Sequence, residues 1–241
     1  EVAVDTETNS LDPHQADLIG ISLCSKVGKA CYIPIGHKSS KCIKKDIVIK
    51  KLKPLLEDPS VKKIGQNIKF DFIVLYKQGI TVSSMEDTML MSYVLDAGKN
   101  RHNMDTLSEI HLGHKTISFK EIVGTGKKEI NFSEVEIDKA KDYAAEDADV
   151  TFRLYKKFIK NLEKDVFKIS KKEFNIASPK QLGEIIYNDL KIAGLKKTKK
   201  GSFATSASVL EDLAFKGHNF PKLVLDWRQV SKLKNTYSDS L

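Results

Sequence analysis

Hydrophobic and polar residues near the start of the chain follow the period of β-strands. In the run Val2–Glu7, Val2 and Val4 fall on one face of a strand, whereas Asp5 and Glu7 fall on the other. Two apolar runs, Leu18–Cys24 and Ala30–Ile35, are joined by Lys26–Lys29, which predicts a β-hairpin. A fourth, short strand is expected at Lys62–Gly65.

Longer segments with the 3.6-residue period of amphipathic helices separate and follow these strands. Gly79 is placed to end one of them, because glycine readily takes the backbone conformation that closes a helix. The expected helices cover Val48–Leu56, Asn67–Gln78, Asp87–Leu95, Asp105–Leu112 and Ile137–Glu163. This alternation predicts an α/β domain with helices flanking a sheet.

The pattern changes in the last third of the chain, where strand-like runs are no longer found. A helix start is expected at Ser178-Pro179, with further helices at Ser206–Phe215 and Leu223–Tyr237. We therefore predict two domains, an α/β domain over 1–165 and a linker with a small all-α module over 166–241.

Positive charge is concentrated in the same part of the chain. The protein has 40 Lys and Arg against 32 Asp and Glu, a net charge of +8. Residues 166–241 hold 14 of the basic residues and 7 of the acidic ones, including the predicted loop Lys196–Lys200. This bias favours contact with a nucleic-acid backbone, and a solvated lysine-rich surface is the alternative.

Composition predicts a globular cytoplasmic protein. The chain is 41% hydrophobic and 30% charged, and its three cysteines, Cys24, Cys31 and Cys42, do not form a disulfide framework. No apolar run reaches the roughly 18 residues that a membrane span needs, and no secretory leader is recognisable. Because the sequence opens inside a strand-like run without methionine, we expect it to begin within a longer protein.

Two carboxylates share one face of the first predicted strand. Asp5 and Glu7 are two positions apart, so their side chains point the same way, about 7 Å apart along the strand. Oxygen ligands of this kind suit a hard divalent cation such as Mg²⁺ or Mn²⁺. The alternative is a solvated strand end.

A third carboxylate, Asp71, lies on or beside the apolar stripe of a predicted helix, three residues after Ile68 and four before Leu75. Burying an unpaired carboxylate is costly, so this position requires a cation, a hydrogen-bond donor or a solvent-filled cleft. The alternative is a residue at the rim that pairs with Lys69.

A fourth carboxylate, Asp147, interrupts the apolar stripe of the longest predicted helix. Tyr143 lies four residues earlier and therefore on the same face, although a helical tyrosine is often only a core residue. The neighbouring acids Asp142, Glu146 and Asp149 point elsewhere, and we interpret them as solvent-exposed or capping charges.

Three segments in this order, "VDTETNSLD", "IGQNIKFDF" and "YAAEDAD", resemble the three motifs of the DEDD exonuclease superfamily, in the subclass with tyrosine in the third motif. The resemblance covers residues 1–165. The segment "NRHNMDTLSEIHLGHKTISFKEI" is similar to the proofreading domain of bacterial family A DNA polymerases, the polymerase I type. "FNIASPKQLGEIIYNDL" and the residues after it resemble the start of the polymerase thumb. The resemblance implies a ribonuclease H-like domain with a mixed sheet, followed by a thumb-like module.

The resemblance also implies a mechanism and a cofactor, two Mg²⁺ or Mn²⁺ ions. In it, Asp5 bridges the two ions, Glu7 and Asp147 complete the first site, and Asp71 holds the second ion largely through water. Tyr143 orients the attacking water. The expected product is a nucleoside 5′-monophosphate released from a DNA 3′ end.

The same resemblance assigns contacts with a single-stranded or frayed 3′ end of DNA. Leu11 wedges against the terminal base, and Thr8 and Asn67 contact the terminal nucleotide. Arg101 and Phe119 approach the single strand. Leu11 and Phe119 have the alternative of being core residues, and Asn67 of only capping its helix. The implied protein is a monomer associated with the bacterial nucleoid.

The sequence departs from the family in two respects. Family members have a longer connection than the one between Glu163 and Phe174, and the polymerase carboxylates and nucleotide-binding helix are not in this sequence. The chain is therefore not expected to polymerise DNA. A catalytically silent DNA-binding scaffold and a ribonuclease D-like 3′ exoribonuclease are the alternatives. His111 and His114 lack cysteine partners at zinc-finger spacing, and we interpret both as surface residues.

Overall fold

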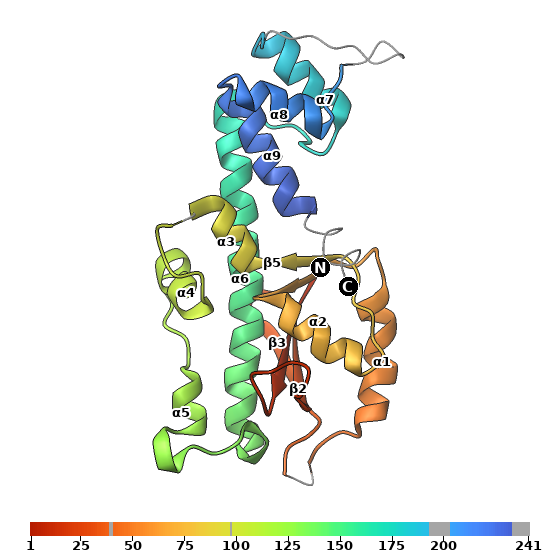
Figure 1. Ribbon diagram of the computed structural model, residues 1–241, viewed down its shortest axis with the longest axis vertical. Helices are drawn as coiled ribbons and strands as arrows, with labels where there is room; N and C mark the ends of the chain where they lie inside the picture. Colours follow the sequence, from red (N-terminus) through yellow and green to blue (C-terminus); the bar gives the residue numbers. More distant parts are fainter. Residues whose placement is uncertain (39–40, 97, 193–202, 233–241) are drawn as a thin grey trace. The chain divides into compact units, whose positions relative to one another are not determined.

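The computed structural model of the protein describes residues 1–38, 41–96, 98–192 and 203–232 (Figure 1). These residues form two compact units, Glu1–Lys157 and Phe158–Lys232, each with a hydrophobic core of its own. The division between Lys157 and Phe158 falls inside the residue range of α6, and the division that we expected after residue 165 stays a prediction.

A mixed sheet forms the centre of the first unit. Its strands are β1 (Val2–Thr8), β2 (Leu18–Lys26), β3 (Lys29–Pro34), β4 (Lys63–Gly65) and β5 (Met85–Asp87), in the spatial order β3-β2-β1-β4-β5. The first three strands pair antiparallel, and β4 and β5 extend the sheet in parallel on the other side of β1. The predicted hairpin and the strand before it are confirmed. The short strand expected at Lys62–Gly65 is β4, whereas β5 was not predicted.

Helices flank this sheet as the sequence pattern predicts. They are α1 (Lys45–Glu57), α2 (Ile68–Lys77), α3 (Thr88–Asp96), α4 (Met104–Leu112), α5 (Phe119–Val123) and α6 (Ile137–Ser170), with short 3₁₀ turns η1 (Gly126–Lys128) and η2 (Phe132–Glu134). The prediction missed α5 and both 3₁₀ turns, which are too short to build an apolar stripe. The longest helix runs past its predicted end at Glu163 to Ser170.

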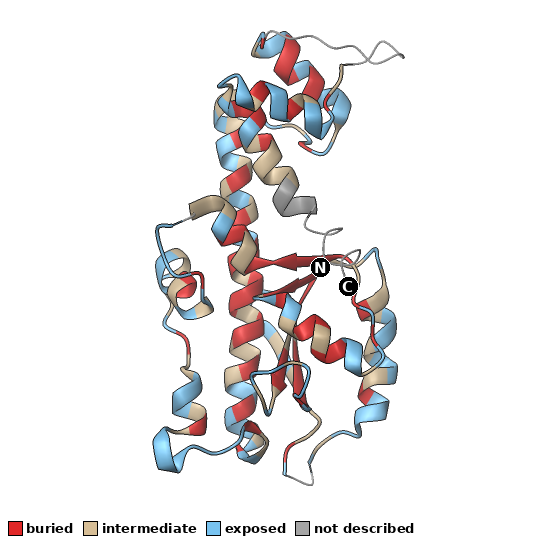
Figure 2. Cartoon of the chain, viewed as in Figure 1, coloured by how far each residue is buried: buried red, intermediate tan, exposed pale blue. Residues whose placement is uncertain are grey.

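The two faces of β1 contact different parts of the first unit. Val2 and Val4 pack in the main core with Leu56 of α1 and Phe72 of α2 (Figure 2). Successive side chains of a strand point to opposite faces, so Asp5 and Glu7 face the other way. Residues of α6 cover the sheet there, and the site described below lies between β1 and α6.

A carboxylate of α6 fastens the helix to the β2–β3 hairpin. The Asp149 Oδ1 atom accepts a hydrogen bond of 2.6 Å from the backbone N–H of Gly28, which has φ of 73° in the hairpin turn. The Cys24 thiol also points to this oxygen, at 3.7 Å. Asp149 is therefore partly buried and links α6 to the hairpin, and its interpretation as an exposed or capping charge was wrong. Asp142, by contrast, is exposed as expected.

The described residues of the second unit form helices and connecting loops, with no strand among them. They are the C-terminal part of α6, then α7 (Pro179–Glu184), a π-helical turn η3 (Ile185–Asp189), α8 (Ala207–Phe215) and α9 (Asn219–Lys232). The Ser178 side chain caps α7, as its position before Pro179 predicts. The core contains Leu182, Ile186 and Leu210. The predicted loop Lys196–Lys200 and the predicted helical residues 233–237 lie outside the described residues.

Within the described part of the chain, no helix combines the length and the apolar character that crossing a membrane would require.

Candidate active site

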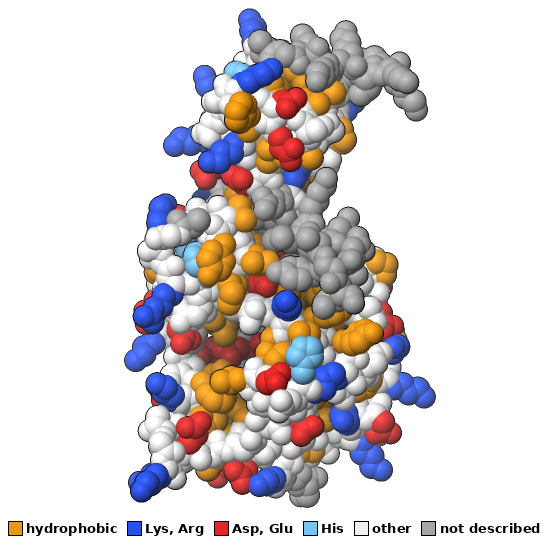
Figure 3. Space-filling view, in the orientation of Figure 1, with side chains coloured by type: hydrophobic (Ala, Val, Ile, Leu, Met, Phe, Trp, Pro, Cys, Tyr) orange, Lys and Arg blue, Asp and Glu red, His pale blue; other side chains and the backbone are white. Residues whose placement is uncertain are grey.

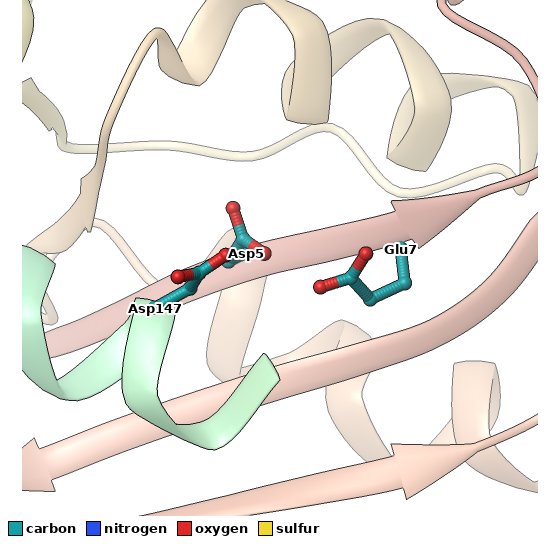
Figure 4. A group of neighbouring side chains, drawn as sticks. All are labelled: Asp5, Glu7 and Asp147. Carbon is teal, nitrogen blue, oxygen red and sulfur yellow. The ribbon is translucent and has the colours of Figure 1, made fainter. Parts of the chain in front are cut away.

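Three carboxylates converge between the sheet and α6. Asp5 and Glu7 come from β1 and Asp147 from α6, and carboxylate oxygens of the three lie within 4.8 Å of one another (Figure 4). The carboxylate of Glu7 points along the strand toward the other two (Figure 4). Figure 3 shows acidic side chains at the bottom of a hollow on the face of the first unit, flanked by apolar side chains. The strand geometry that the sequence indicates is therefore confirmed for the two residues of β1.

Burial and mutual repulsion destabilise the ionised carboxylates of this cluster. Burial raises the pKa of Asp5 from 3.8 to about 6. It also raises the pKa of Glu7 well above its ordinary range, and the charges of the neighbouring carboxylates raise it further. For Asp147, burial and the charge of Asp5 raise the pKa, while a hydrogen bond with Tyr143 offsets part of the effect. Carboxylates at this distance are stabilised by protonation or by a cation between them.

One oxygen of the cluster has an unused hydrogen-bonding capacity. The Glu7 Oε1 atom is fully buried and has no hydrogen-bond partner among the described residues. A buried acceptor without a donor is rare and costly in proteins, unless a cation or water satisfies it. The donor set, carboxylate oxygens alone, suits Mg²⁺ or Mn²⁺. The three residues therefore fit the divalent cation that the sequence pattern predicts.

Asp71 of α2 meets β1 beyond the point where β4 stops pairing with that strand. The strand β4 pairs with β1 only as far as Ala3, so the N–H groups of β1 beyond this point have no strand to donate to on that side. The Asp71 Oδ1 atom accepts the N–H of Thr6 at 2.8 Å and its hydroxyl at 2.6 Å. Asp71 is 3% exposed, which excludes a position at the solvated rim. Its partner is thus Thr6, next to Asp5.

The charge of Asp71 interacts with the cluster although it bonds to Thr6. Burial raises its pKa well above the ordinary range, the charge of Asp5 adds to this, and the two bonds from Thr6 act in the opposite direction. Whether Asp71 ligates a second ion stays a prediction. The bond to Thr6 was not predicted, because the sequence does not reveal where β4 stops covering the edge of β1.

Tyr143 lies one helical turn before Asp147 and its ring belongs to an aromatic cluster. Phe119 and Phe132 flank the Tyr143 ring, with centroid distances of 6.0 and 6.1 Å. Burial and the charge of Asp147 raise the pKa of Tyr143 far above its ordinary value, so the phenol stays neutral. Phe119 remains 43% exposed, and the interpretation of Phe119 as a core residue is wrong.

Glu146 ties the segment before α5 to α6. Its two carboxylate oxygens accept hydrogen bonds from His114 Nε2 at 2.8 Å and from the backbone N–H of Ile117 at 2.6 Å. Glu146 was expected to be solvent-exposed or capping, and His114 to be a surface residue. Both are half-buried and bonded to each other. Helical spacing correctly placed Glu146 off the Asp147 face, but a segment 30 residues earlier packs there.

The structure shows the predicted DNA-contact residues as follows. Leu11 is 93% exposed, which excludes a place in the core. Asn67 and Arg101 are exposed, and the Asn67 side chain makes no capping bond to α2. Thr8 is half-buried and donates its hydroxyl to the carbonyl of Ser10. Their contact with DNA stays a prediction.

Sequence reasoning missed Tyr32 and His37, which lie behind Glu7. The Tyr32 hydroxyl and His37 Nε2 are 2.6 Å apart, and His37 Nδ1 lies 3.1 Å from the Val135 carbonyl. Gly20 pairs with Glu7 in the sheet, and a Cβ at Gly20 would lie 2.1 Å from the Tyr32 hydroxyl. A glycine inside a predicted strand is a sign of such a close approach, and it could have led to this pair.

Two family models match the chain. A model described as 3'-5' exonuclease matches residues 1–163, and one described as DNA polymerase family A matches residues 148–241. The first covers the whole sheet and all four candidate carboxylates. The second covers the helical second unit, where we expected the start of a polymerase thumb.

Curated relatives extend this match over the whole chain. DNA polymerase I of Rhizobium leguminosarum is 39% identical and that of Pseudomonas aeruginosa is 36% identical, each over all of this chain. The chain covers 30% and 32% of these relatives, so it spans about a third of their length. The match to the Rhizobium protein runs over 310 residues against 241 here, so that protein carries residues within the matched segment that this chain lacks.

Solved structures agree with the fold of the first unit. The chain resembles a structure described as the apo form of a nuclease, with a TM-score of 0.55 and 24% identity over 68% of this chain and 73% of that one. Brucella melitensis NrnC with bound Mg²⁺ gives a TM-score of 0.51 and 26% identity over 68% of this chain and 74% of that one. The mixed sheet with flanking helices is the ribonuclease H-like exonuclease fold. The chain belongs to the bacterial DNA polymerase I family, and it contains a 3′–5′ exonuclease domain and part of the family A polymerase domain.

Proposed function

We propose that this chain is a proofreading exonuclease, which removes mismatched nucleotides from the 3′ end of DNA by two-metal-ion hydrolysis. The observation that carries the proposal is the meeting of Asp5, Glu7 and Asp147 within 4.8 Å, with one buried Glu7 oxygen left without a partner. A catalytically silent scaffold has no need for such a costly cluster. The intact carboxylates therefore favour an enzyme.

The side chains divide the work in the following way. Asp5, Glu7 and Asp147 would hold one divalent cation, and Asp71 would help hold a second next to Asp5. Ions in such a pair activate a water and stabilise the charge that develops on the leaving 3′ oxygen. Tyr143 keeps its proton, so its hydroxyl can hydrogen-bond to the attacking water and orient it.

The surroundings of the cluster support a frayed 3′ end as the substrate. Leu11 projects almost fully into solvent from the loop after β1, and an exposed apolar side chain there can wedge against a terminal base. Phe119 is half-exposed beside Tyr143, where it can contact an unpaired base. Separating the strands is easiest at a mismatch, so such contacts would select mismatched ends. The rest of the proposal is a monomer in the bacterial cytoplasm, joined to the remainder of a polymerase chain.

The direct test is degradation of 5′-labelled single-stranded DNA in Mg²⁺ by the purified chain. We expect stepwise shortening from the 3′ end with release of nucleoside 5′-monophosphates. Asp5→Asn should abolish this activity, because it removes a ligand charge at the centre of the cluster. Asp12→Asn is the matched control, since Asp12 is an exposed acid in the loop after β1 and should leave the rate unchanged.

The same assay separates the alternatives. Binding of DNA without shortening would favour the silent scaffold. Preference for RNA of the same sequence over DNA would favour the ribonuclease D-like alternative. Equal shortening by wild type and Asp5→Asn would mean that the observed activity comes from another site or a contaminant, and it would overturn the proposal.

A further inference from the structure

Asp87 ends β5 beside the turn that carries Asn67. It pairs in register with Gly65, the last residue of β4, and it is 4% exposed. A Cβ at Gly65 would lie 2.7 Å from the side chain of Ile68, so the turn from β4 into α2 leaves no space for a side chain at Gly65. Asp87 therefore lies beside the close turn between β4 and α2.

The Asp87 carboxylate accepts three backbone hydrogen bonds. Its Oδ1 atom accepts the N–H of Asn67 at 3.0 Å and that of Met89 at 2.9 Å, and its Oδ2 atom accepts the N–H of Ile68 at 3.1 Å. The N–H groups at a helix start have no partner within the helix, and a negative charge is favoured there. A single carboxylate thus holds the first turns of both α2 and α3.

Asn67 has an unusual backbone conformation for a residue that starts a helix. Its φ and ψ are 60° and 45°, in the left-handed region, whereas residues at this position normally have an extended backbone. Its side chain makes no capping bond to α2. The amide of Asn67 is exposed and available for a ligand. Left-handed residues other than glycine are sparse and often mark binding sites.

We propose that Asp87 is a positioning residue for DNA binding, which holds Asn67 in its left-handed conformation and thereby presents the Asn67 amide to the terminal nucleotide. The inference rests on the proposed function for the identity of the ligand. It assigns a role to a buried acid that lies outside the carboxylate cluster. Asp87 acts through the backbone of Asn67 and does not itself touch the substrate.

A double-mutant cycle tests this role by binding, independently of cleavage. The measurement is the fluorescence anisotropy of labelled single-stranded oligothymidylate in Ca²⁺, with wild type, Asp87→Asn, Asn67→Ala and the double variant. Asp87→Asn keeps the shape of the side chain and one acceptor oxygen but removes the charge. We expect each single variant to weaken binding about fivefold and the double variant to be no weaker than Asn67→Ala alone.

Leu11→Ala provides the matched second cycle. Leu11 lies in the loop after β1 and is 93% exposed, and Asp87 accepts its hydrogen bonds from the starts of α2 and α3. Asp87→Asn and Leu11→Ala should therefore multiply their effects. If Asp87 only stabilised the fold, its substitution would weaken binding equally in all backgrounds and would show no coupling to Asn67.

Hydrogen exchange of the wild-type chain tests the inference without any substitution. The Asn67 and Ile68 amides should exchange slowly, whereas those of Lys45 and Asp46 should exchange fast, because no side chain caps α1. Fast exchange at Asn67, unchanged binding in Asp87→Asn, or full multiplication of its effect with that of Asn67→Ala would each overturn the inference. If the wild type does not cleave DNA but Asp87 and Asn67 are still coupled in DNA binding, only the proposed enzyme activity would be overturned.

Discussion

Neutralising one carboxylate of the cluster should make the metal-free protein more stable. Burial raises the pKa of Asp5 from 3.8 to about 6, so the folded state binds a proton more tightly than the unfolded state does. One pKa unit corresponds to about 1.4 kcal/mol, which makes the ionised Asp5 cost the folded protein about 3 kcal/mol at neutral pH. Asp5→Asn removes this cost and leaves a side chain of nearly the same shape.

The pH dependence has a definite sign. Because the pKa is higher in the folded state, the metal-free wild type should gain stability as the pH falls from 7.5 through about 6 toward the unfolded value of 3.8. The raised pKa values of Glu7, Asp71 and Asp147 act in the same direction. Asp5→Asn should reduce this gain, since one of the interacting charges is gone at every pH.

Urea unfolding in EDTA at pH 7.5 and pH 5.5 measures both effects. We expect Asp5→Asn to raise the free energy of unfolding at pH 7.5 by about 1 to 3 kcal/mol, less than the full cost because the remaining carboxylates adjust their protonation. Asp12→Asn should change nothing. Mg²⁺ should stabilise the wild type but not Asp5→Asn. An Asp5→Asn variant that is no more stable than the wild type in EDTA would refute the argument that this cluster is strained by its own charge.

Three further substitutions probe the site and its frame. Tyr143→Phe should lower kcat on single-stranded DNA by about a hundredfold with little change in melting temperature, because the ring stays packed and only the hydroxyl proposed to orient the water is lost; an unchanged kcat would remove Tyr143 from the proposed mechanism. Leu11→Ala should leave the melting temperature unchanged, since Leu11 is 93% exposed, but should slow removal of a paired 3′ end more than that of a single strand. Gly65→Ala should destabilise the first unit by about 1 to 3 kcal/mol in urea unfolding, since its Cβ would meet Ile68 at 2.7 Å; a neutral effect would show that this turn can relax.

Local periodicity was sufficient to predict the strands of the hairpin and the position of the carboxylates on β1. Asp5 and Glu7 share a face for geometric reasons that any strand obeys. The same rule could not place Asp71, which meets β1 at Thr6 only because β4 ends its pairing at Ala3. That contact depends on the length and register of a neighbouring strand, which the local pattern does not contain.

Helical spacing predicted which acids of α6 face the cluster, but not what the others contact. Asp147 and Tyr143 were placed correctly on one face. Glu146 and Asp149 were interpreted as exposed or capping charges, yet they bind segments that precede them by about 30 and 121 residues. The N–H groups of Ile117 and Gly28 are among their partners, and every residue except proline carries such a group. No sequence signal therefore identifies such partners in advance.

The bond between Asp149 and Gly28 limits how the chain can be engineered. The turn of the β2–β3 hairpin looks like a suitable place for an insertion, since it is exposed and far from the cluster in sequence. Its length nevertheless places the N–H of Gly28 within hydrogen-bonding distance of Asp149, which lies two positions after Asp147. A tag or a longer loop at this turn would break this bond, so it would loosen the stretch of α6 that carries Asp147, a proposed metal ligand, without touching the site itself.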